Sequence, residues 1–259
     1  MRLKDKNILI TGSATGIGEA MARRFVAEGA RVVIHGLDPS AGEAVTKSLG
    51  DKASLHICDL AKPQSATELV AFAIQQFNGR LDGLVNNAAY IPRSNLFTTD
   101  AELFDRTMAI NVRAPMLLIQ AAFPFLKKSH GAVLNIGSVN VYTGESNLLP
   151  YSISKGALMT LTRNLADAHA VDRVRFNQIN PGWVLSNNED KMQQSLGKPA
   201  DWHQHLPKSQ APSGRILRPD ELAAAAVYWM SDESAIVSGT VMEIEQFPII
   251  GRNPMKEIQ

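Results

Sequence analysis

The chain has 259 residues, 45% of them hydrophobic, and its 26 basic residues nearly balance its 25 acidic ones. This length and apolar content suit one domain with a sizeable core, and the near-zero net charge gives no electrostatic reason to expect nucleic acid or a membrane as a partner. A single cysteine, Cys58, excludes an internal disulfide. The charged start at Met1 to Lys6, and the lack of any run near ~18 apolar residues, favour a cytoplasmic protein.

Short apolar runs alternate with amphipathic stretches along the whole chain. The strands that they predict span 7–11, 31–36, 54–59, 81–86, 132–138, 173–180 and 240–245. Helices are predicted after a glycine-rich turn at 12–18, from 38, from 63, and over 100–127, 151–169 and 221–230, with kinks or breaks at Pro115 and Pro124. The alternation predicts an α/β fold: a single Rossmann-type, doubly wound domain over 1–259, with a mostly parallel seven-stranded sheet and helices on both faces.

The least regular segment, 183–215, is polar, contains three prolines and separates a predicted strand from a predicted helix. Irregular segments of this length often act as lids or binding loops. We therefore predict a substrate lid here, with a surface loop of no function as the alternative. His203 and His205 lie in this segment and are expected to be solvated, because nothing in the chain clusters like a metal site.

The first predicted strand leads into a turn with three glycines, Gly12, Gly16 and Gly18. Glycines let a backbone approach a pyrophosphate closely, and the free N–H groups and positive dipole of a helix start favour phosphate. The spacing is G-x-x-x-G-x-G rather than the commoner G-x-G-x-x-G. Its position between strand and helix predicts a dinucleotide site, and a glycine-rich turn without a ligand is the alternative.

Polar residues end later strands, at the edge where parallel sheets bind ligands. Asn86 and Asn87 close the fourth predicted strand, and Asp59 ends the third. Two roles are open for Asp59: it accepts a hydrogen bond from an adenine amino group, or it caps the helix that follows.

Tyr151 and Lys155 are four residues apart on a predicted helix, so their side chains project from one face. A phenol has a pKa of about 10, and lowering it to about 7 requires roughly 4 kcal/mol. An ammonium about 4 Å away supplies on the order of 4 kcal/mol. Ser138, at the end of the fifth predicted strand, is expected to hold a substrate oxygen in line with the Tyr151 proton. The three residues predict proton transfer coupled to hydride transfer by a nicotinamide.

Together these residues resemble the classical short-chain dehydrogenases/reductases, over nearly the whole chain. The resemblance rests on T-G-x-x-x-G-x-G at 11–18, Asp59, N-N-A at 86–88, Asn111, Ser138, Tyr151, Lys155, and Pro181-Gly182 followed by Ser186. It implies a catalytic tetrad of Asn111, Ser138, Tyr151 and Lys155. In that tetrad Tyr151 is the acid/base and Ser138 orients the substrate. Lys155 also binds the nicotinamide ribose, and Asn111 holds a water that relays protons to Lys155.

The resemblance also implies that Ser186 contacts the nicotinamide carboxamide. The predicted cofactor contacts are Gly12, Ser13, Thr15, Gly16, Ile17, Gly18, Asp38, Asp59, Leu60, Asn87, Ala88, Tyr151, Lys155, Pro181, Gly182, Val184 and Ser186. The chain departs from the family in two places. Ala89 replaces the glycine of N-N-A-G, and Glu-Ile-Glu-Gln-Phe-Pro at 243–248 replaces a V-D-G-G-like turn, which puts family detail near the C-terminus in doubt.

The end of the second strand separates NAD from NADP in this fold. Gly36 stands where a carboxylate would hold the ribose hydroxyls, and Leu37 where an arginine would contact a 2′-phosphate. Thr15 replaces the basic residue of many NADP-type turns. Asp38 either reaches the ribose or caps the next helix. With no cation to neutralise a phosphate, NAD is the favoured cofactor.

The predicted activity interconverts a secondary alcohol and a ketone. The predicted substrate contacts are Ser138, Asn140, Tyr142, Glu145, Asn147 and Trp183. A pocket this polar suits a polyol, sugar or sugar acid. The alternatives are a 3-oxoacyl-carrier-protein ketoreductase, which would want a basic patch and usually NADP, and a non-catalytic nicotinamide-binding module. The resemblance implies a homotetramer or homodimer, with the apolar faces of helices 100–127 and 151–169 as candidate interfaces.

Overall fold

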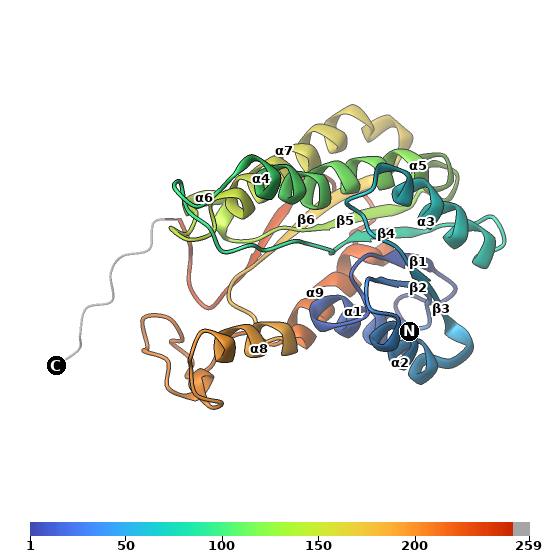
Figure 1. Ribbon diagram of the computed structural model, residues 1–259. Coiled ribbons are helices and arrows are strands. Elements are labelled where there is room, and N and C mark those ends of the chain that lie inside the picture. Colours follow the sequence, from blue (N-terminus) through green and yellow to red (C-terminus); the bar gives the residue numbers. More distant parts are fainter. Residues whose placement is uncertain (251–259) are drawn as a thin grey trace.

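The computed structural model describes residues 1–250, and Figure 1 shows them as a sheet between two layers of helices. The strand order is β3-β2-β1-β4-β5-β6-β7, and every neighbouring pair is parallel. The strands are β1 (Asn7–Ile10), β2 (Arg31–Gly36), β3 (Ala53–Ile57), β4 (Gly83–Asn86), β5 (Ala132–Ile136), β6 (Arg175–Pro181) and β7 (Val241–Ile244). The predicted seven-stranded, doubly wound sheet is confirmed.

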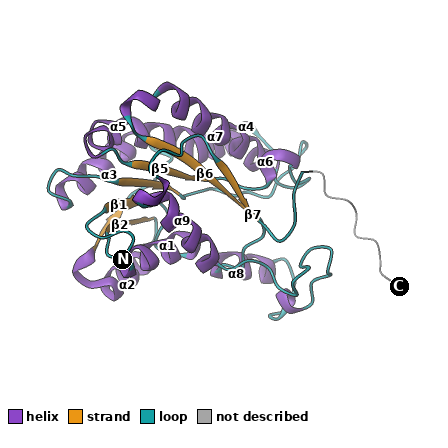
Figure 2. Ribbon diagram, turned by 180° about the vertical axis from the view of Figure 1, so that it is seen from behind, coloured by secondary structure: helices purple, strands orange, loops and turns teal. Residues whose placement is uncertain are grey.

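Helices cover both faces of the sheet, with α3, α5 and α7 on one side and α1, α2 and α9 on the other (Figures 1 and 2). The helices are α1 (Gly16–Ala27), α2 (Pro39–Leu49), α3 (Pro63–Gln76), α4 (Ala101–Met108), α5 (Ala114–Ser129), α6 (Asn140–Thr143), α7 (Leu149–Ala168), α8 (Asn187–Ser195) and α9 (Pro219–Met230). Each layer has its own apolar core. Phe25 and Trp229 lie in one, and Leu69, Leu118 and Phe176 in the other.

Several strands end earlier than predicted, because the polar residues at their ends turn out of the sheet. The β3 strand stops at Ile57, and the Asp59 carbonyl accepts the Lys62 N–H in a turn. The β5 strand stops at Ile136, two residues before Ser138. These loops at the carboxyl ends of the strands form the rim on which ligands bind in such sheets.

The long helix predicted over 100–127 is a continuous helical run from 101 to 129, interrupted by a π-helical turn, Ala109–Arg113. The Ala114 N–H bonds to the Ala109 carbonyl, five residues back. The irregularity directly precedes Pro115, which has no N–H to donate. Of the kink or break predicted at Pro124, the break is wrong, because α5 continues through this residue.

By length and composition, the run 101–129 could cross a membrane, which corrects the expectation that no segment approaches that limit. Scattered polar residues interrupt the apolar ones, so the stretch contains no unbroken apolar run of that length. Half of its most apolar window is buried, and Leu118, Ile119, Ala122 and Leu126 pack in the core under the sheet. These four apolar residues therefore belong to the interior of the fold.

The segment predicted as a lid is more regular than expected, because it contains α8. Its two ends meet where Val184 forms a parallel bridge with Leu217. Trp202, Ala211 and Ile216 form a small core of their own within it. In Figure 2 this unit projects from the rest of the fold beside α9.

Candidate active site

The glycine turn is closed on three sides by neighbouring backbone. Gly12 has φ +62°, and a Cβ on it would meet the Ala88 Cα at 2.8 Å. A Cβ on Gly18 would collide with the Gly12 carbonyl. Thr15 precedes α1 without a side-chain cap, so the first N–H groups of that helix are free for a ligand. The turn thus fits a pyrophosphate.

The N-N-A segment fixes this turn rather than only lining it. The Asn87 amide donates to the carbonyls of Thr11 and Gly12, both at 2.9 Å. The Thr11 hydroxyl accepts the N–H groups of Asn87 and Ala88, both at 3.0 Å. The Asn87 side chain, which was predicted to contact the cofactor, is therefore committed to the shape of the turn. Asn86 lies inside the sheet and donates to Asn135 at 2.8 Å.

The loop after β5 and the helix α7 bring Ser138, Tyr151 and Lys155 together, as the sequence predicted. Tyr151 is 8% exposed and Lys155 is 3% exposed. Ser138 lies close enough to the Tyr151 phenol to lower the pKa of that phenol. The Lys155 ammonium donates to the Ile136 carbonyl at 2.6 Å and lies 5.5 Å from the centre of the Tyr151 ring.

The predicted lowering of the Tyr151 pKa is wrong for this structure. Burial raises the pKa of Tyr151 to about 12, against the opposing effect of Ser138, and Glu145 and Glu189 raise it further. Burial also lowers the pKa of Lys155 to about 8. The spacing of four residues places both side chains on one face, but the ammonium is bound at the end of β5 rather than at the phenol oxygen. Burial of Tyr151 therefore favours the neutral phenol over the phenolate.

Asn111 lies in the π-helical turn and is almost completely buried. Its Oδ1 accepts the Tyr90 N–H at 2.8 Å, and its Nδ2 donates to the Tyr90 carbonyl and to the Ser154 hydroxyl, both at 2.9 Å. The side chain therefore joins the loop after β4 to α7, beside Tyr151. Its predicted role as the holder of a relay water stays a prediction.

The two aspartates predicted near the adenosine serve local turns. Asp38 caps α2 and accepts the Ser40 N–H at 2.9 Å. Asp59 accepts the Ala61 N–H at 2.9 Å, while Lys62 stands at the N-cap position of α3 without a side-chain capping bond. These contacts support the capping role for Asp38, whereas Asp59 holds a turn just before the helix. A role for either in binding adenosine stays a prediction.

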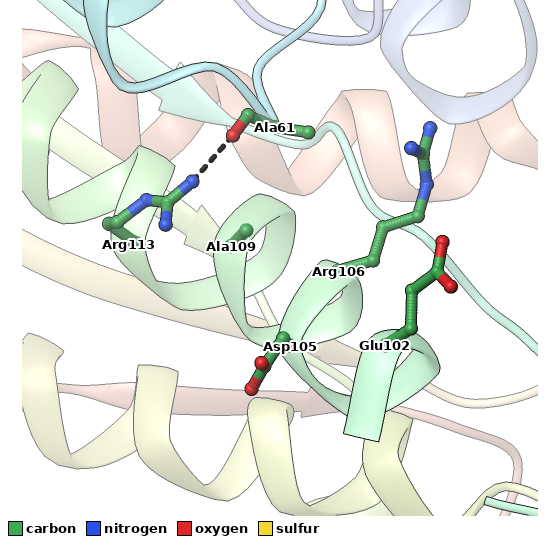
Figure 3. Close-up of a pocket in the computed structure, with 6 residues that line it drawn as sticks. All are labelled: Ala61, Glu102, Asp105, Arg106, Ala109 and Arg113. Carbon is green, nitrogen blue, oxygen red and sulfur yellow. Dashed lines mark hydrogen bonds between the residues drawn. The ribbon is translucent and has the colours of Figure 1, made fainter. Parts of the chain in front are cut away.

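Beside Asp59 the surface is hollowed over the π-helical turn, as Figure 3 shows. The hollow has a volume of about 540 Å³ and is lined by Ala61, Glu102, Asp105, Arg106, Ala109 and Arg113. Arg113 donates to the Ala61 carbonyl. Arg106 lies 3.9 Å from the Asp59 carboxylate and stacks over the Tyr90 ring. The two arginines thus contact the 59–61 turn from the neighbouring helical run.

A polar cluster stands near the catalytic residues, and it includes a residue that the sequence analysis missed. Arg93 follows β4 and lies 4.0 Å from the Glu145 carboxylate. Asn147, with its amide oriented to suit both neighbours, accepts from Arg93 at 3.0 Å and donates to Glu145 at 3.1 Å. Arg93 also reaches Met192 on α8 at 3.2 Å. It therefore joins the predicted substrate residues to the predicted lid.

The remaining predicted substrate residues are distributed unevenly. The Trp183 indole donates to Glu189 on α8 at 2.8 Å. Asn140 donates its backbone N–H to Ser138 at 3.2 Å. The Tyr142 hydroxyl lies near Glu243 of β7 and Asn180 of β6, and burial together with Glu243 raises its pKa. In the lid, His205 pairs with Asp201 and His203 packs against Trp202.

The segment predicted as a lid contacts the glycine turn directly. Ser186 caps α8, and its Cβ is 3.6 Å from where a side chain on Gly16 would begin. Asn188 on α8 donates to the Thr15 hydroxyl at 3.1 Å. The proximity of Ser186 agrees with its predicted place in the cofactor site, and Asn188 is a contact that no spacing in the sequence indicated.

Comparisons with known proteins identify the family. A family model described as enoyl-(acyl carrier protein) reductase matches residues 12–246. The chain is a short-chain dehydrogenase/reductase. It is a nicotinamide-dependent oxidoreductase that interconverts an alcohol and a ketone.

Several relatives of this short-chain dehydrogenase/reductase match nearly end to end. An uncharacterized oxidoreductase of Thermotoga maritima is 34% identical, over 95% of this chain and 98% of its own. The L-fucose dehydrogenase of Bos taurus is 35% identical, over 92% and 87%. The 3-ketoacyl-(acyl-carrier-protein) reductase of Brucella melitensis, solved as a complex with NADH, superposes with a TM-score of 0.83 at 30% identity, over 94% and 98%.

The segment 243–248, which stands in this short-chain dehydrogenase/reductase where the family usually has a V-D-G-G-like turn, begins at the end of β7. Glu245 accepts the N–H groups of Trp183 at 3.1 Å and Gln246 at 2.7 Å. The Gln246 side chain accepts from the Ser213 N–H at 3.0 Å and donates to the Arg215 carbonyl at 2.7 Å. The unusual segment thus ties both ends of the predicted lid to the sheet.

Proposed function

We propose that Tyr151 exchanges a proton with the substrate oxygen while Ser138 orients that oxygen. The observation that carries this is the buried Tyr151 phenol, with Ser138 beside it on the ligand-binding rim. When bound, the nicotinamide supplies or takes up the hydride, and the positive charge of its oxidised ring favours the phenolate. Lys155, buried below the phenol, supplies a positive charge to the same site, and Asn111 fixes the start of α7 through Ser154.

The test is Tyr151→Phe, which removes the hydroxyl and keeps the ring. Turnover is expected to fall by about 10²–10⁴-fold, the usual contribution of a general acid–base, while the dissociation constant of the reduced cofactor stays within about twofold. Turnover that survives the substitution contradicts the assignment. A wild-type protein that binds cofactor but turns over no alcohol or ketone would instead be a nicotinamide-binding module.

We infer that NAD is the preferred cofactor. The Leu37 side chain is largely exposed and offers no charge to a 2′-phosphate. A Cβ on Gly36 would meet the Ala14 Cβ at 2.7 Å, so a carboxylate cannot be added there without moving the turn. Catalytic efficiency is therefore expected to be higher with NAD than with NADP, and Leu37→Arg is expected to narrow the difference. A clear NADP preference in the wild type contradicts the inference.

We infer further that the substrate is polar: a polyol, a sugar or a sugar acid. Arg93, Asn147 and Glu145 present donors and acceptors side by side, which suits hydroxyl groups that both donate and accept. An apolar substrate would cover these groups without offering partners to their remaining donors and acceptors, at a cost in affinity. The L-fucose dehydrogenase of Bos taurus, a relative at 35% identity, acts by its name on a sugar.

A panel of polyols, sugars, sugar acids and apolar ketones tests this inference. Arg93→Met is expected to raise KM for the best polar substrate by about tenfold, as for loss of a charge-assisted hydrogen bond, and to leave the cofactor constant unchanged. Arg24→Met is the matched control, because Arg24 pairs with Glu28 on α1. Turnover restricted to apolar ketones overturns the inference.

A ketoreductase that acts on carrier-bound acyl groups is the second candidate. The matched family model and the solved Brucella melitensis enzyme both bear carrier-protein reductase names. This candidate predicts turnover of an acetoacetyl thioester above that of any polyol. For either candidate we propose a cytoplasmic homodimer or homotetramer that uses the half-exposed Met116 and Ile153 of α5 and α7, testable by light scattering.

A further inference from the structure

His35 is the next-to-last residue of β2 and is almost completely enclosed, at 3% exposure. Its Nδ1 accepts the Gly12 N–H at 3.0 Å, and its Nε2 is 3.1 Å from the Cys58 carbonyl. Its backbone is also bound to the turn, because the His35 carbonyl accepts the Ser13 N–H at 2.8 Å and the Ser13 hydroxyl accepts the His35 N–H at 3.0 Å. One residue thus joins the first two residues of the turn to the end of β3.

The two side-chain contacts fix the state of the ring. A carbonyl only accepts, so Nε2 carries the hydrogen, and an N–H group only donates, so Nδ1 keeps its lone pair. The ring is therefore neutral, in the Nε2–H form. Burial lowers the pKa of His35 to about 4, and the ionisable neighbours that act on it are His56, which opposes protonation, and Asp59, which favours it.

The backbone at Gly12 is packed too closely to shift. Its missing side chain lets it lie against Ala88, its φ is positive, and its carbonyl lies against Gly18 at the start of α1. The Asn87 amide holds this same carbonyl from the other side. The Gly12 N–H is the group that His35 holds, so His35 sets the orientation of the peptide that leads into the phosphate turn.

We propose that His35 is a positioning residue for cofactor binding, which holds the glycine turn at a fixed distance from the Cys58–Asp59 end of β3. A dinucleotide seated on the turn has its adenosine half toward the β2 and β3 ends in this fold. His35 touches both sides of that half-site through neutral hydrogen bonds. It acts through the backbone of Gly12 and does not itself contact the reacting atoms.

The chain provides a matched control in His56. The two histidines are register partners in β2 and β3, but the His56 ring packs on Phe72 at 4.8 Å, and no hydrogen bond of its ring is found among residues 1–250. The variants are His35→Ala, His35→Asn, which keeps an acceptor near Nδ1, and His56→Ala. The dissociation constants of reduced cofactor and of ADP-ribose are measured by nicotinamide fluorescence and by competition.

His35→Ala is expected to raise the dissociation constants of both ligands by about tenfold, as for one lost hydrogen bond. Its kcat at saturating cofactor is expected to stay within about twofold of the wild-type value. His35→Asn is expected to be intermediate and His56→Ala unchanged. Because ADP-ribose binding needs no substrate, the result is independent of the substrate assignment. The proposal is overturned if His35→Asn binds reduced cofactor within twofold of wild type. It is also overturned if His56→Ala loses as much cofactor affinity as the His35 variants, or if kcat of the His35 variants falls by the same factor as their affinity. His35→Asn alone decides if the alanine variant does not fold.

Discussion

The cofactor side and the substrate side of the rim are held by different kinds of contact. The glycine turn is fixed by buried hydrogen bonds from Thr11, Ser13 and His35, all 3% exposed or less. The substrate side depends on Arg93 and Glu145, whose side chains are 29% and 52% exposed and 4.0 Å apart. Breaking a buried bond costs far more than breaking an exposed ion pair. A substitution in the glycine turn is therefore expected to cost more free energy than a substitution among the proposed substrate contacts.

The largest effect is expected at Lys155, where the two sides meet. Lys155→Met should lower turnover by about 10²–10⁴-fold and yet stabilise the protein at pH 7. The folded pKa of about 8 lies below the ordinary value of 10.5, so the unfolded chain binds more protons between these pH values. The wild type therefore gains stability as pH rises from 8 to 10.5, by at most about 3 kcal/mol.

Urea denaturation of both proteins across this pH range measures the difference. Lys155→Met should be the more stable protein at pH 7, and its advantage should shrink toward pH 10.5. A variant less stable than wild type at pH 7 would show that the Ile136 hydrogen bond outweighs the cost of burying the ammonium.

The next effect is expected in the turn itself. Gly12→Ala places a Cβ 2.8 Å from the Ala88 Cα at a positive φ. Strain of about 1–3 kcal/mol should raise the dissociation constant of the reduced cofactor by about 10–100-fold, as measured by fluorescence titration. Gly156→Ala is the control, because a Cβ there has open space in the interior of α7 and should stabilise the protein by about 0.5–1 kcal/mol. Equal cofactor affinity in the two variants would show that the turn is not held as tightly as its contacts indicate.

The sequence could predict features that depend on local patterns, but not contacts between residues far apart in the chain. The strand Arg31–Gly36, the glycine turn and the grouping of Ser138, Tyr151 and Lys155 follow from local periodicity and from the topology of a parallel sheet, and the structure has them. The contacts of His35 with Gly12, Arg93 with Met192 and Asn188 with Thr15 join residues 23, 99 and 173 positions apart, which no local pattern encodes. The prediction of a lowered Tyr151 pKa was wrong for a related reason. Helical spacing places Tyr151 and Lys155 on one face, but it does not show that the ammonium donates to the Ile136 carbonyl.

The smallest effect is expected where the lid touches the turn. Asn188→Ala removes the exposed bond from α8 to Thr15, which should weaken reduced cofactor by about two- to fivefold. Gln194→Ala removes an exposed bond within the same helix, to Asp190 at 3.0 Å, and should change nothing. If Asn188→Ala weakened binding as much as Gly12→Ala, the lid would belong to the rigid cofactor side. If the two lid variants behaved alike, the Asn188 contact would contribute nothing, and the turn would depend on its buried bonds alone.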